Sequence, residues 1–415
     1  MALSLGRGQF RILCMSAAES PMPIPPPDPD AQAHSDRLRA AIHADIAASG
    51  GAVPFSRFME LALYAPGLGY YSAGSTKFGR AGDFVTAPEL GPLFAECVIE
   101  ALAPVLRQLG EGADFVEIGG GSGAFAEVAL GHLAALDALP ARYAILEPSA
   151  DLRERQRTRL QQRLPADLFA RVEWLDRPRE ESWQGVLFAN EVIDALPTPR
   201  FVIRNGEVME EGVASASDGG FRLVEVPADA LMTAAVRHVE HQRGDGAFRD
   251  GYRSELLPQL PYWIQAVMGA MQAGAMLFID YGHPRREYYA DNRPDGTLRA
   301  FYRHHVVQDV FARVGLQDIT ASVDFTALAE AGTGAGFEFA GYCSQAAFLL
   351  GNGLEQRLAA HEANAPSDRA RFSLRQQVQQ LTMPGAMGER FQAMGFEHGV
   401  AFEAAFLAGD LSFRL

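Results

Sequence analysis

The feature that most limits how this chain can fold is a run of glycines between a short apolar segment and a helix-forming segment. Residues 114–118 (Asp-Phe-Val-Glu-Ile) predict a buried strand, the sequence Gly-Gly-Gly-Ser-Gly follows at 119–123, and residues 124–136 predict a helix. A glycine-rich turn between a strand and a helix lets a ligand approach the backbone at the helix N-terminus. We therefore expect an α/β sheet with a ligand crevice at this turn.

The alternation of strands and helices continues along the chain. Apolar stretches predict further strands at 142–146, 172–175, 185–189 and 275–279, and a charged stretch at 149–163 predicts a helix. Alternating strands and helices favour a parallel sheet with helices on both faces. Buried parallel strands are continuously apolar, as these stretches are.

The segments around this alternation predict additional structure. Before it, we expect a proline-rich linker at 21–30, helices at 35–48, 55–63 and 89–109, and a long loop at 67–82. Between the fourth and fifth strands, residues 201–213 predict a hairpin that turns at Asn205-Gly206, and residues 221–226 predict a strand. After the fifth strand, we expect a helix at 306–314, strands at 318–323 and 337–342, and a helical tail at 354–406.

We expect six consecutive parts. They are an unfolded extension and linker (1–34), a helical and loop region that covers the ligand site (35–112), the first part of the ligand-binding domain (113–199), an inserted substrate-recognition lobe (200–270), the second part of the domain (271–350) and a C-terminal helical tail (351–415). The stretch before Met15 lacks the apolar core of a secretory signal. An organelle-targeting segment, or an extended translation start with Met15 as the initiator, would account for it.

Composition disfavours several classes of protein. No stretch approaches the about 18–20 consecutive apolar residues of a membrane helix. Cys14, Cys97 and Cys343 are scattered and form no CxxC pair, so neither a disulfide framework nor a cysteine zinc site is expected. The net charge of −15 disfavours a general nucleic-acid binder. It suits a cationic substrate or a basic peptide, although acidity also serves solubility.

The glycines alone leave two ligand classes open. Gly119, Gly121 and Gly123 fit G-x-G-x-G, whereas Gly119, Gly121 and Ala124 fit the dinucleotide pattern. Glu117, two residues before the first glycine, would repel a pyrophosphate and would suit the ammonium and sulfonium of S-adenosylmethionine. A tight turn without any ligand is the remaining alternative.

Further acidic and polar residues follow the predicted strands. Glu147 ends the second strand, where a carboxylate can accept hydrogen bonds from the ribose hydroxyls that both cofactors share. Asn190, Glu191 and Asp194 follow the fourth strand and would face the crevice. The two carboxylates could bind a guanidinium and accept its proton, or Asn190 could simply cap a helix.

The fifth strand ends in Asp280-Tyr-Gly-His283. Asp280 and Tyr281 are candidates for positioning the substrate, and His283 is a candidate general base, although a lone loop histidine is more often structural. The paired histidines at 238 and 241 and at 304 and 305 have no third partner at ligand spacing, so no metal site is expected.

These motifs together resemble the MidA-like class I methyltransferases, the family of the mitochondrial complex I assembly-factor arginine methyltransferase. The resemblance covers residues 35–395, and its most specific parts are 82–89 (Gly-Asp-Phe-Val-Thr-Ala-Pro-Glu) and 190–197 (Asn-Glu-Val-Ile-Asp-Ala-Leu-Pro). The other matching stretches are 69–71, 94–96, 116–123, 146–149, 280–283, 323–325 and 387–391.

The resemblance implies a fold, a cofactor and roles for residues. It implies a seven-stranded, mostly parallel α/β sheet of the class I methyltransferase type that binds S-adenosylmethionine and methylates a protein arginine, in eukaryotes on the 49 kDa subunit of complex I. By the family's pattern the methionine end would meet Glu117, Gly119, Gly121 and Gly123, and the ribose would meet Glu147. Asp83 and Thr86 would help to close the site, and Asn190, Glu191 and Asp194 would face the acceptor.

The chain departs from the family at some of these positions. Family members often have Gly-Pro-Gly-Arg-Gly at the glycine turn, and the retained glycines leave cofactor binding intact. Some members have His at the position of Asn190 and Asp at the position of Ser322, which makes the acceptor less certain.

We therefore expect a cytoplasmic bacterial methyltransferase, or a mitochondrial matrix protein if the source is eukaryotic, that acts on a complex I subunit. We expect neither nucleic-acid binding nor membrane insertion. A nicotinamide-dependent oxidoreductase and an assembly chaperone with a vestigial cofactor site are the alternatives.

Overall fold

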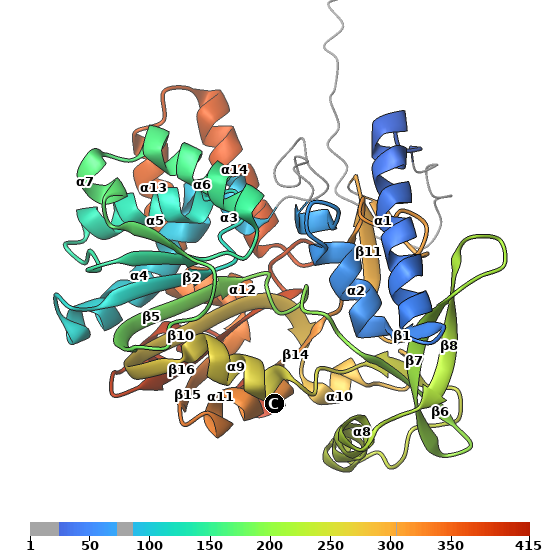
Figure 1. The fold of residues 1–415 in the computed structure, drawn as a ribbon. Coiled ribbons are helices and arrows are strands. Elements are labelled where there is room, and N and C mark those ends of the chain that lie inside the picture. Colours follow the sequence, from blue (N-terminus) through green and yellow to red (C-terminus); the bar gives the residue numbers. More distant parts are fainter. Residues whose placement is uncertain (1–24, 73–85, 304) are drawn as a thin grey trace, which may run out of the picture.

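A computed structural model describes residues 25–72, 86–303 and 305–415 (Figure 1). Within these residues the largest sheet has the strand order β15-β16-β10-β5-β2-β3-β4. Its parallel strands are β2 (Asp114–Ile118), β3 (Tyr143–Leu146), β4 (Val172–Leu175), β5 (Ser182–Asn190) and β10 (Ala270–His283). At one edge β16 (Phe391–His398) lies antiparallel between β10 and β15 (Glu338–Ser344), and the short β14 (Val323–Asp324) pairs with the end of β10. This arrangement confirms the expected seven-stranded, mostly parallel sheet.

Helices cover both faces of this sheet because successive strand residues point to opposite sides. Val186 and Phe188 of β5 pack with α4 (Pro92–Leu109) and α5 (Ala124–Ala135). Leu187 and Ala189 pack on the other face with α9 (Leu260–Met268) and α11 (Phe325–Gly334). The connection from β3 to β4 contains α6 (Ala150–Arg163) and α7 (Ala166–Phe169).

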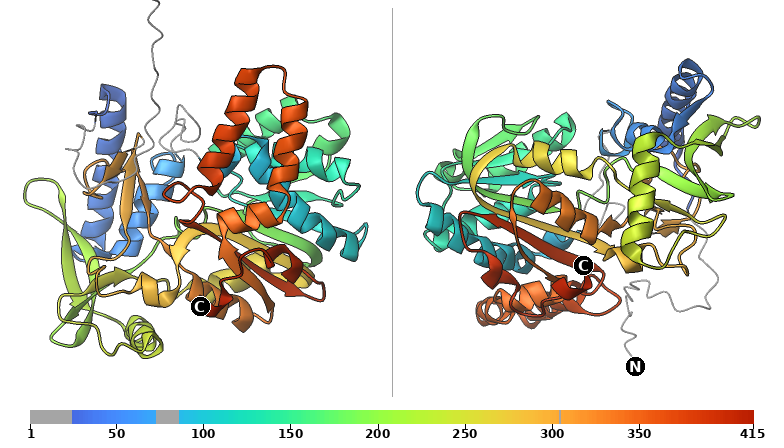
Figure 2. Two further views of the ribbon diagram at one scale, coloured as in Figure 1. Left: turned by 180° about the vertical axis from the view of Figure 1, so that it is seen from behind. Right: turned by 90° about the horizontal axis from the view of Figure 1, so that it is seen from below.

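The inserted segment shares its sheet with the N-terminal region, which the sequence did not indicate. β1 (Ala52–Pro54) pairs with β7 (Glu207–Ser215) of the insert. Both views of Figure 2 show the blue N-terminal helices beside the green strands of the insert. The other strands of this sheet are β6 (Arg200–Arg204), β8 (Phe221–Pro227) and β9 (Arg253–Glu255). The helix α8 (Ala230–Arg243) lies between β8 and β9 in the sequence. The hairpin at Asn205-Gly206 is confirmed, and both residues have the positive φ that such a turn requires.

The first helix begins earlier than expected, the second begins at Phe55 as expected, and the helix expected at 89–109 is divided at Gly91, which has a φ of +147°. α1 (Pro29–Ala48) starts before Ser35 because the Asp28 side chain accepts a hydrogen bond from the backbone N–H of Ala31 at 2.9 Å and Pro29 suits the first helical position. The next elements are α2 (Phe55–Tyr64), the 3₁₀ turn η1 (Tyr70–Ser72) and α3 (Ala87–Leu90). Residues 1–24 of the expected extension, and most of the expected loop at 67–82, lie outside the described residues.

The helix expected at 306–314 is wrong. Residues 305–307 form β12, which pairs with β11 (Arg299–Tyr302), and β11 also pairs with β13 (Asp318–Thr320). After β12 the chain turns, because Asp309 accepts a hydrogen bond from the backbone N–H of Phe311 at 2.8 Å. Gln317 also donates to the carbonyl oxygens of Asp309 and Val310, which a helix would use itself.

The prediction of a helical tail at 354–406 is wrong at residues 391–398. These residues form β16, the strand that lies between β10 and β15 in the main sheet. Helices do form before it, at α12 (Gln345–Gly351), α13 (Leu354–Ala363) and α14 (Asp368–Thr382). The remaining short elements are α10 (Arg285–Tyr288), η2 (Glu403–Phe406) and η3 (Ser412–Arg414).

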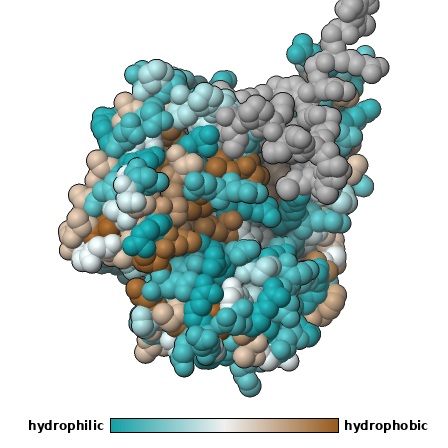
Figure 3. All heavy atoms as spheres, turned by 90° about the vertical axis from the view of Figure 1, so that its right-hand side faces the viewer, coloured by the Kyte–Doolittle hydropathy of each residue, from teal (hydrophilic) through white to brown (hydrophobic). Residues whose placement is uncertain are grey.

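None of the helices in the described ranges is both long and apolar enough to cross a membrane. On the face shown in Figure 3 the lower half is mainly hydrophilic, and hydrophobic atoms gather near the middle.

Candidate active site

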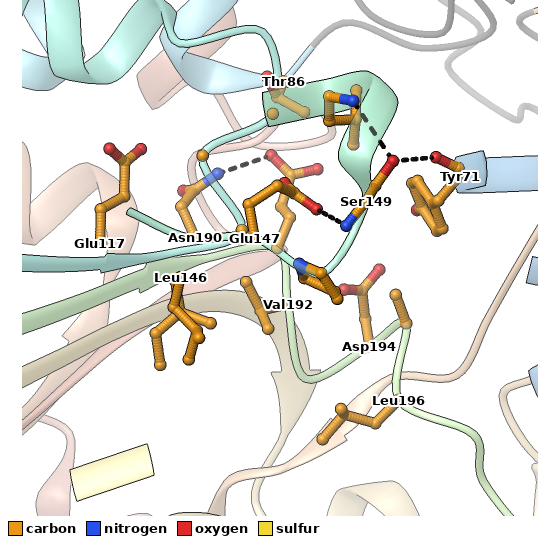
Figure 4. A pocket seen from close by; sticks show the side chains of 18 of the residues that line it. Tyr71, Thr86, Glu117, Leu146, Glu147, Ser149, Asn190, Val192, Asp194 and Leu196 are labelled. Atoms are coloured by element: carbon orange, nitrogen blue, oxygen red, sulfur yellow. Dashed lines mark hydrogen bonds between the residues drawn. The ribbon is translucent and has the colours of Figure 1, made fainter. Parts of the chain in front are cut away.

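A cavity of about 680 Å³ lies at the carboxyl ends of the parallel strands. The ends of β2, β3, β5 and β10 contribute Glu117, Glu147, Asn190 and Tyr281 to its lining. Residues of α2, η1, α3, α5, α6, α9, β11 and β13 also line it. In open α/β sheets ligands bind at this edge. Figure 4 shows Glu117, Glu147, Asn190 and Asp194 around this space.

The glycine turn brings bare backbone against the cavity. A Cβ on Gly119, which has a φ of +67°, would lie 3.0 Å from Cγ2 of Val192, and a Cβ on Gly120 would lie 2.8 Å from Cγ2 of Ile145. Side chains are therefore excluded at these two positions, and α5 begins directly after Gly123. The turn leaves backbone groups and space for a ligand, as a nucleoside cofactor requires.

Glu117 is buried below this turn. Its Oε2 accepts a hydrogen bond from the Tyr143 hydroxyl at 2.8 Å. Loss of solvation raises the pKa of Glu117 to about 7, although the Tyr143 hydrogen bond opposes the shift. No cationic side chain of the described residues is among the groups that shift the pKa of Glu117. A positively charged ligand would therefore supply the opposite charge that stabilises its carboxylate.

Glu147 is buried at the end of β3 and is held by two donors. Its oxygens accept hydrogen bonds from the backbone N–H of Ser149 at 3.0 Å and from Nε2 of Gln156 at 3.2 Å. Gln156 also donates to the carbonyl oxygen of Gly121 at 3.0 Å and accepts from the Trp174 indole at 3.0 Å. Gln156 thus links the glycine turn to Glu147. Sequence reasoning missed it, because a glutamine in a charged helix gives no signal of its own.

Asn190, Glu191 and Asp194 all line the cavity. Glu191 has a φ of +54°, a strained conformation for a residue other than glycine, and its side chain accepts a hydrogen bond from Nδ2 of Asn190 at 3.1 Å. Burial and the nearby Asp194 raise the pKa of Glu191 to about 8. Burial raises the pKa of Asp194 to about 6, although a hydrogen bond from the Tyr281 hydroxyl at 2.8 Å opposes the shift.

The two residues expected to position the substrate lie in different places. Tyr281 lines the cavity, and Asp280 is not among the lining residues. Oδ2 of Asp280 instead accepts hydrogen bonds from the backbone N–H groups of Val192, Ile193 and Asp194, at 3.2, 3.0 and 3.3 Å. Asp280 therefore holds the turn that carries Glu191 and Asp194.

Of the other predicted site residues that the structure describes, Thr86 lines the cavity and His283 does not. Thr86 is buried, lines the cavity and precedes α3, whereas Asp83 lies outside the described residues. His283 does not line the cavity, and burial lowers its pKa to about 4, with Arg293 contributing.

Several cavity residues were missed by sequence reasoning. Tyr64 of α2 and Tyr71 of η1 stack with a centroid separation of 5.5 Å, and the Tyr71 hydroxyl donates to Oδ1 of Asp318 at 3.0 Å. Residues 69–71 were noted only as part of a resemblance. Asp318 gave no signal because it lies on a three-residue strand outside the main sheet.

The cavity is strongly acidic. Its described lining contains eight carboxyl groups and no Arg, Lys or His; they belong to Glu60, Glu89, Glu117, Glu147, Asp176, Glu191, Asp194 and Asp318. Such a lining favours a cationic ligand.

Comparisons with known proteins agree with this geometry. Residues 97–343 match a family model described as "Putative S-adenosyl-L-methionine-dependent methyltransferase". A crystal structure of a Burkholderia thailandensis protein bound to S-adenosyl-homocysteine is 40% identical, covers 94% of this chain and 100% of its own, and has a TM-score of 0.86.

Curated relatives are more distant. The mitochondrial protein arginine methyltransferase NDUFAF7 homolog of Drosophila melanogaster is 28% identical over 379 residues, which are 85% of this chain and 83% of that protein. The human protein arginine methyltransferase NDUFAF7 is also 28% identical, over 83% of this chain and 79% of its own length. The chain therefore belongs to this family of S-adenosyl-L-methionine-dependent methyltransferases.

Proposed function

We propose that the chain methylates an arginine side chain of a protein. The observation that carries this proposal is the cavity beside the glycine turn, whose described lining holds eight carboxyl groups and no cationic side chain. S-adenosylmethionine carries its methyl group on a sulfonium, and the neutral thioether that forms when the methyl group is transferred is a good leaving group. The residues of the chain therefore need mainly to orient the acceptor and take up a proton.

Two parts of the cavity suit the two ends of the cofactor. Glu117 and the turn at Gly119, Gly121 and Gly123 would hold the methionine end, where the Glu117 carboxylate faces an ammonium. Glu147, already oriented by Ser149 and Gln156, would accept from the ribose hydroxyls. Thr86 and Asn190, with Asp83, would close the cofactor site.

The acceptor end has buried acceptor atoms without donors. Oδ1 of Asp194 and Oδ1 of Asn190 have no hydrogen-bond partner within the described part of the chain. A guanidinium brings five N–H donors in a flat fork, which fits several such oxygens together. Tyr281, whose hydroxyl donates to Asp194, would position that carboxylate.

The raised pKa values suit the proton transfer. Attack by a terminal guanidinium nitrogen forms the new C–N bond while the C–S bond breaks, and the nitrogen then releases one proton. Asp194, with a pKa of about 6, is mostly ionised near neutral pH and holds a proton more firmly than an ordinary carboxylate. Glu191, with a pKa of about 8 in the free chain, would become a proton acceptor when the cationic guanidinium beside it favours the carboxylate form. The cationic methylguanidinium and the neutral thioether are the products.

The acceptor that we propose is a subunit of respiratory complex I. Support comes from the curated relatives, which are named as arginine methyltransferases, and from the resemblance of residues 190–197 to a complex I assembly-factor family. We place the reaction in the bacterial cytoplasm, since the structurally matched relative at 40% identity comes from a bacterium. A eukaryotic source would place it in the mitochondrial matrix.

The proposal can be tested in cells. Tryptic peptides from the source organism with and without this gene would be compared by mass spectrometry. We expect a methylated arginine peptide of a complex I subunit to disappear in the deletion strain. The wild-type chain would restore it, and a chain with Glu191→Gln and Asp194→Asn would not. A complete and unchanged set of methylarginine peptides in the deletion strain would refute the proposal.

A further inference from the structure

We propose that Asp318, held by Tyr71, is a third carboxylate that binds the acceptor guanidinium. The inference rests on the proposed function and extends it to residues outside the main sheet. Asp318 belongs to β13 of the three-stranded sheet, and Tyr71 belongs to η1 of the N-terminal region.

The two residues form a buried pair in the wall of the cavity. Asp318 is 4% exposed, and its Oδ1 accepts the Tyr71 hydroxyl hydrogen bond at 3.0 Å. Tyr71 stacks on Tyr64 with an angle of 22° between the rings. Phe301, which pairs with Asp318 in the strand register, lines the same cavity.

Direct contacts join this wall to the turn that carries the proposed proton acceptors. Ala321 lies three residues after Asp318, and its backbone N–H donates to the carbonyl oxygen of Asp194 at 3.0 Å. On the other side, the Tyr64 hydroxyl donates to the carbonyl oxygen of Ala195 at 2.9 Å. β13 and α2 are thus both fixed to the turn at 194–195, so Asp318 keeps a defined position relative to Asp194.

The three carboxyl groups of Glu191, Asp194 and Asp318 line one cavity. Burial raises the pKa of Glu191 most, and the charges of Asp194 and Asp318 raise it further. Burial also raises the pKa of Tyr64 most, and the charges of Asp318 and Asp194 add to that shift. Tyr64 lines the same cavity as these three carboxyl groups.

The chemistry of this arrangement suits a guanidinium. Its N–H donors lie along several edges of one plane, so carboxylates from two separate elements can bind it at once. Its faces can contact aromatic rings, which Tyr64, Tyr71 and Phe301 supply. Asp318 would therefore bind and orient the acceptor, whereas Glu191 and Asp194 would also take up the proton.

The test uses the purified chain, tritiated S-adenosylmethionine and, as acceptor, total protein from a strain without this gene. Initial rates of methylarginine formation are measured at several acceptor concentrations. For Asp318→Asn we expect the acceptor concentration at half-maximal rate to rise at least about tenfold, because a charged hydrogen bond is lost. Calorimetry should show unchanged affinity for S-adenosylmethionine, which also establishes that the variant folds.

Two further variants sharpen the test. Tyr71→Phe should raise the acceptor concentration at half-maximal rate less than Asp318→Asn does. In the double variant it should cause little further rise, because Tyr71 acts through the Asp318 carboxylate. Glu207→Gln removes one negative charge from an exposed position on β7 and should behave as the wild type.

The outcomes separate the inference from the proposed function. An unchanged acceptor dependence in Asp318→Asn, with methylarginine still formed, would overturn only the role of Asp318. The absence of methylarginine with the wild-type chain would overturn the proposed function together with this inference.

Discussion

Three buried carboxyl groups distinguish this cavity at the scale of single residues. Glu117, Glu191 and Asp194 have raised pKa values because burial removes solvation, and the groups that lower them are hydrogen-bond donors rather than cations. Proteins rarely bury carboxylates without a charged partner. In this site the ligands can supply the missing positive charges.

Glu117 should make cofactor binding depend on pH. Its pKa of about 7 means that it is partly protonated near neutral pH, and the ammonium of S-adenosylmethionine favours the carboxylate. Affinity measured by calorimetry should therefore rise between about pH 6 and pH 8, with release of a proton. Glu117→Gln should weaken binding at least about tenfold and flatten this pH dependence. A wild-type affinity that falls over this range would contradict the role.

Gln156 should be needed for the cofactor site although it is fully buried behind it. The Trp174 indole can only donate, so the amide nitrogen of Gln156 must face Gly121 and Glu147. Gln156→Glu would place a second carboxyl group against Glu147, and we expect affinity for S-adenosylmethionine to fall at least about tenfold. Gln161→Glu, at an exposed position of the same helix, is the matched control. Equal affinities of the two variants would argue against this role.

At the scale of elements, strands that are apolar on both faces could be predicted well. The predicted bounds of β2 agree with the structure, because all five of its residues are buried and turn residues limit the run. The bounds of β4 also agree, although this edge strand contains Glu173 and is half-buried. β16 was missed because its pairing partner β10 lies more than a hundred residues away in the sequence. The role of Asp318 was missed for the same reason, because its partner Tyr71 is 247 residues away. Glu117, Glu147 and Asn190 could be placed because strand ends define the crevice.

β16 should be essential to the stability of the molecule. Phe396 is fully buried, its ring centroid lies 6.2 Å from that of Phe278, and it packs against Gly332. We expect Phe396→Ala to lower the free energy of unfolding in urea by about 3–5 kcal/mol. Phe372 of α14 is 62% exposed, and Phe372→Ala should change the free energy by less than about 1 kcal/mol. Similar losses in the two variants would mean that β16 is not packed as described.

At the scale of the whole molecule, the candidate active site lies between the main sheet, the three-stranded sheet and the N-terminal region. The main sheet supplies the cofactor turn and the acidic turn, and the N-terminal region and the three-stranded sheet supply Tyr71 and Asp318. The N-terminal region is also tied to the insert through β1 and β7. Of the insert expected at 200–270, only Trp263, Ala266 and Val267 of α9 are among the described residues that line the cavity.

The buried acids should make the free protein less stable at mildly alkaline pH. The pKa values of Glu117 and Glu191 are about 7 and about 8 in the folded chain, above the ordinary value of 4.5. The folded state therefore binds more protons than the unfolded state, and the free energy of unfolding falls as pH rises through these values. From about pH 6.5 to 8.5 we expect a loss on the order of 2 kcal/mol in urea unfolding.

A variant with Glu117→Gln and Glu191→Gln provides the control for this stability measurement. It should lose most of the dependence on pH, because neither amide titrates. A stability of the wild-type chain that rises over the same pH range would contradict the assignment of raised pKa values.

We propose that the acidic cavity presents an arginine side chain to the methyl donor. The most direct measurement is the chemical identity of the methylated residue. Total protein from a strain without this gene is incubated with the purified chain and tritiated S-adenosylmethionine, and the protein is then hydrolysed in acid and separated by chromatography. We expect the label to elute with methylarginine standards and to be absent when a chain with Glu191→Gln and Asp194→Asn is used in place of the wild-type chain. Label in methyllysine, or in volatile methanol from carboxyl methyl esters, would contradict it.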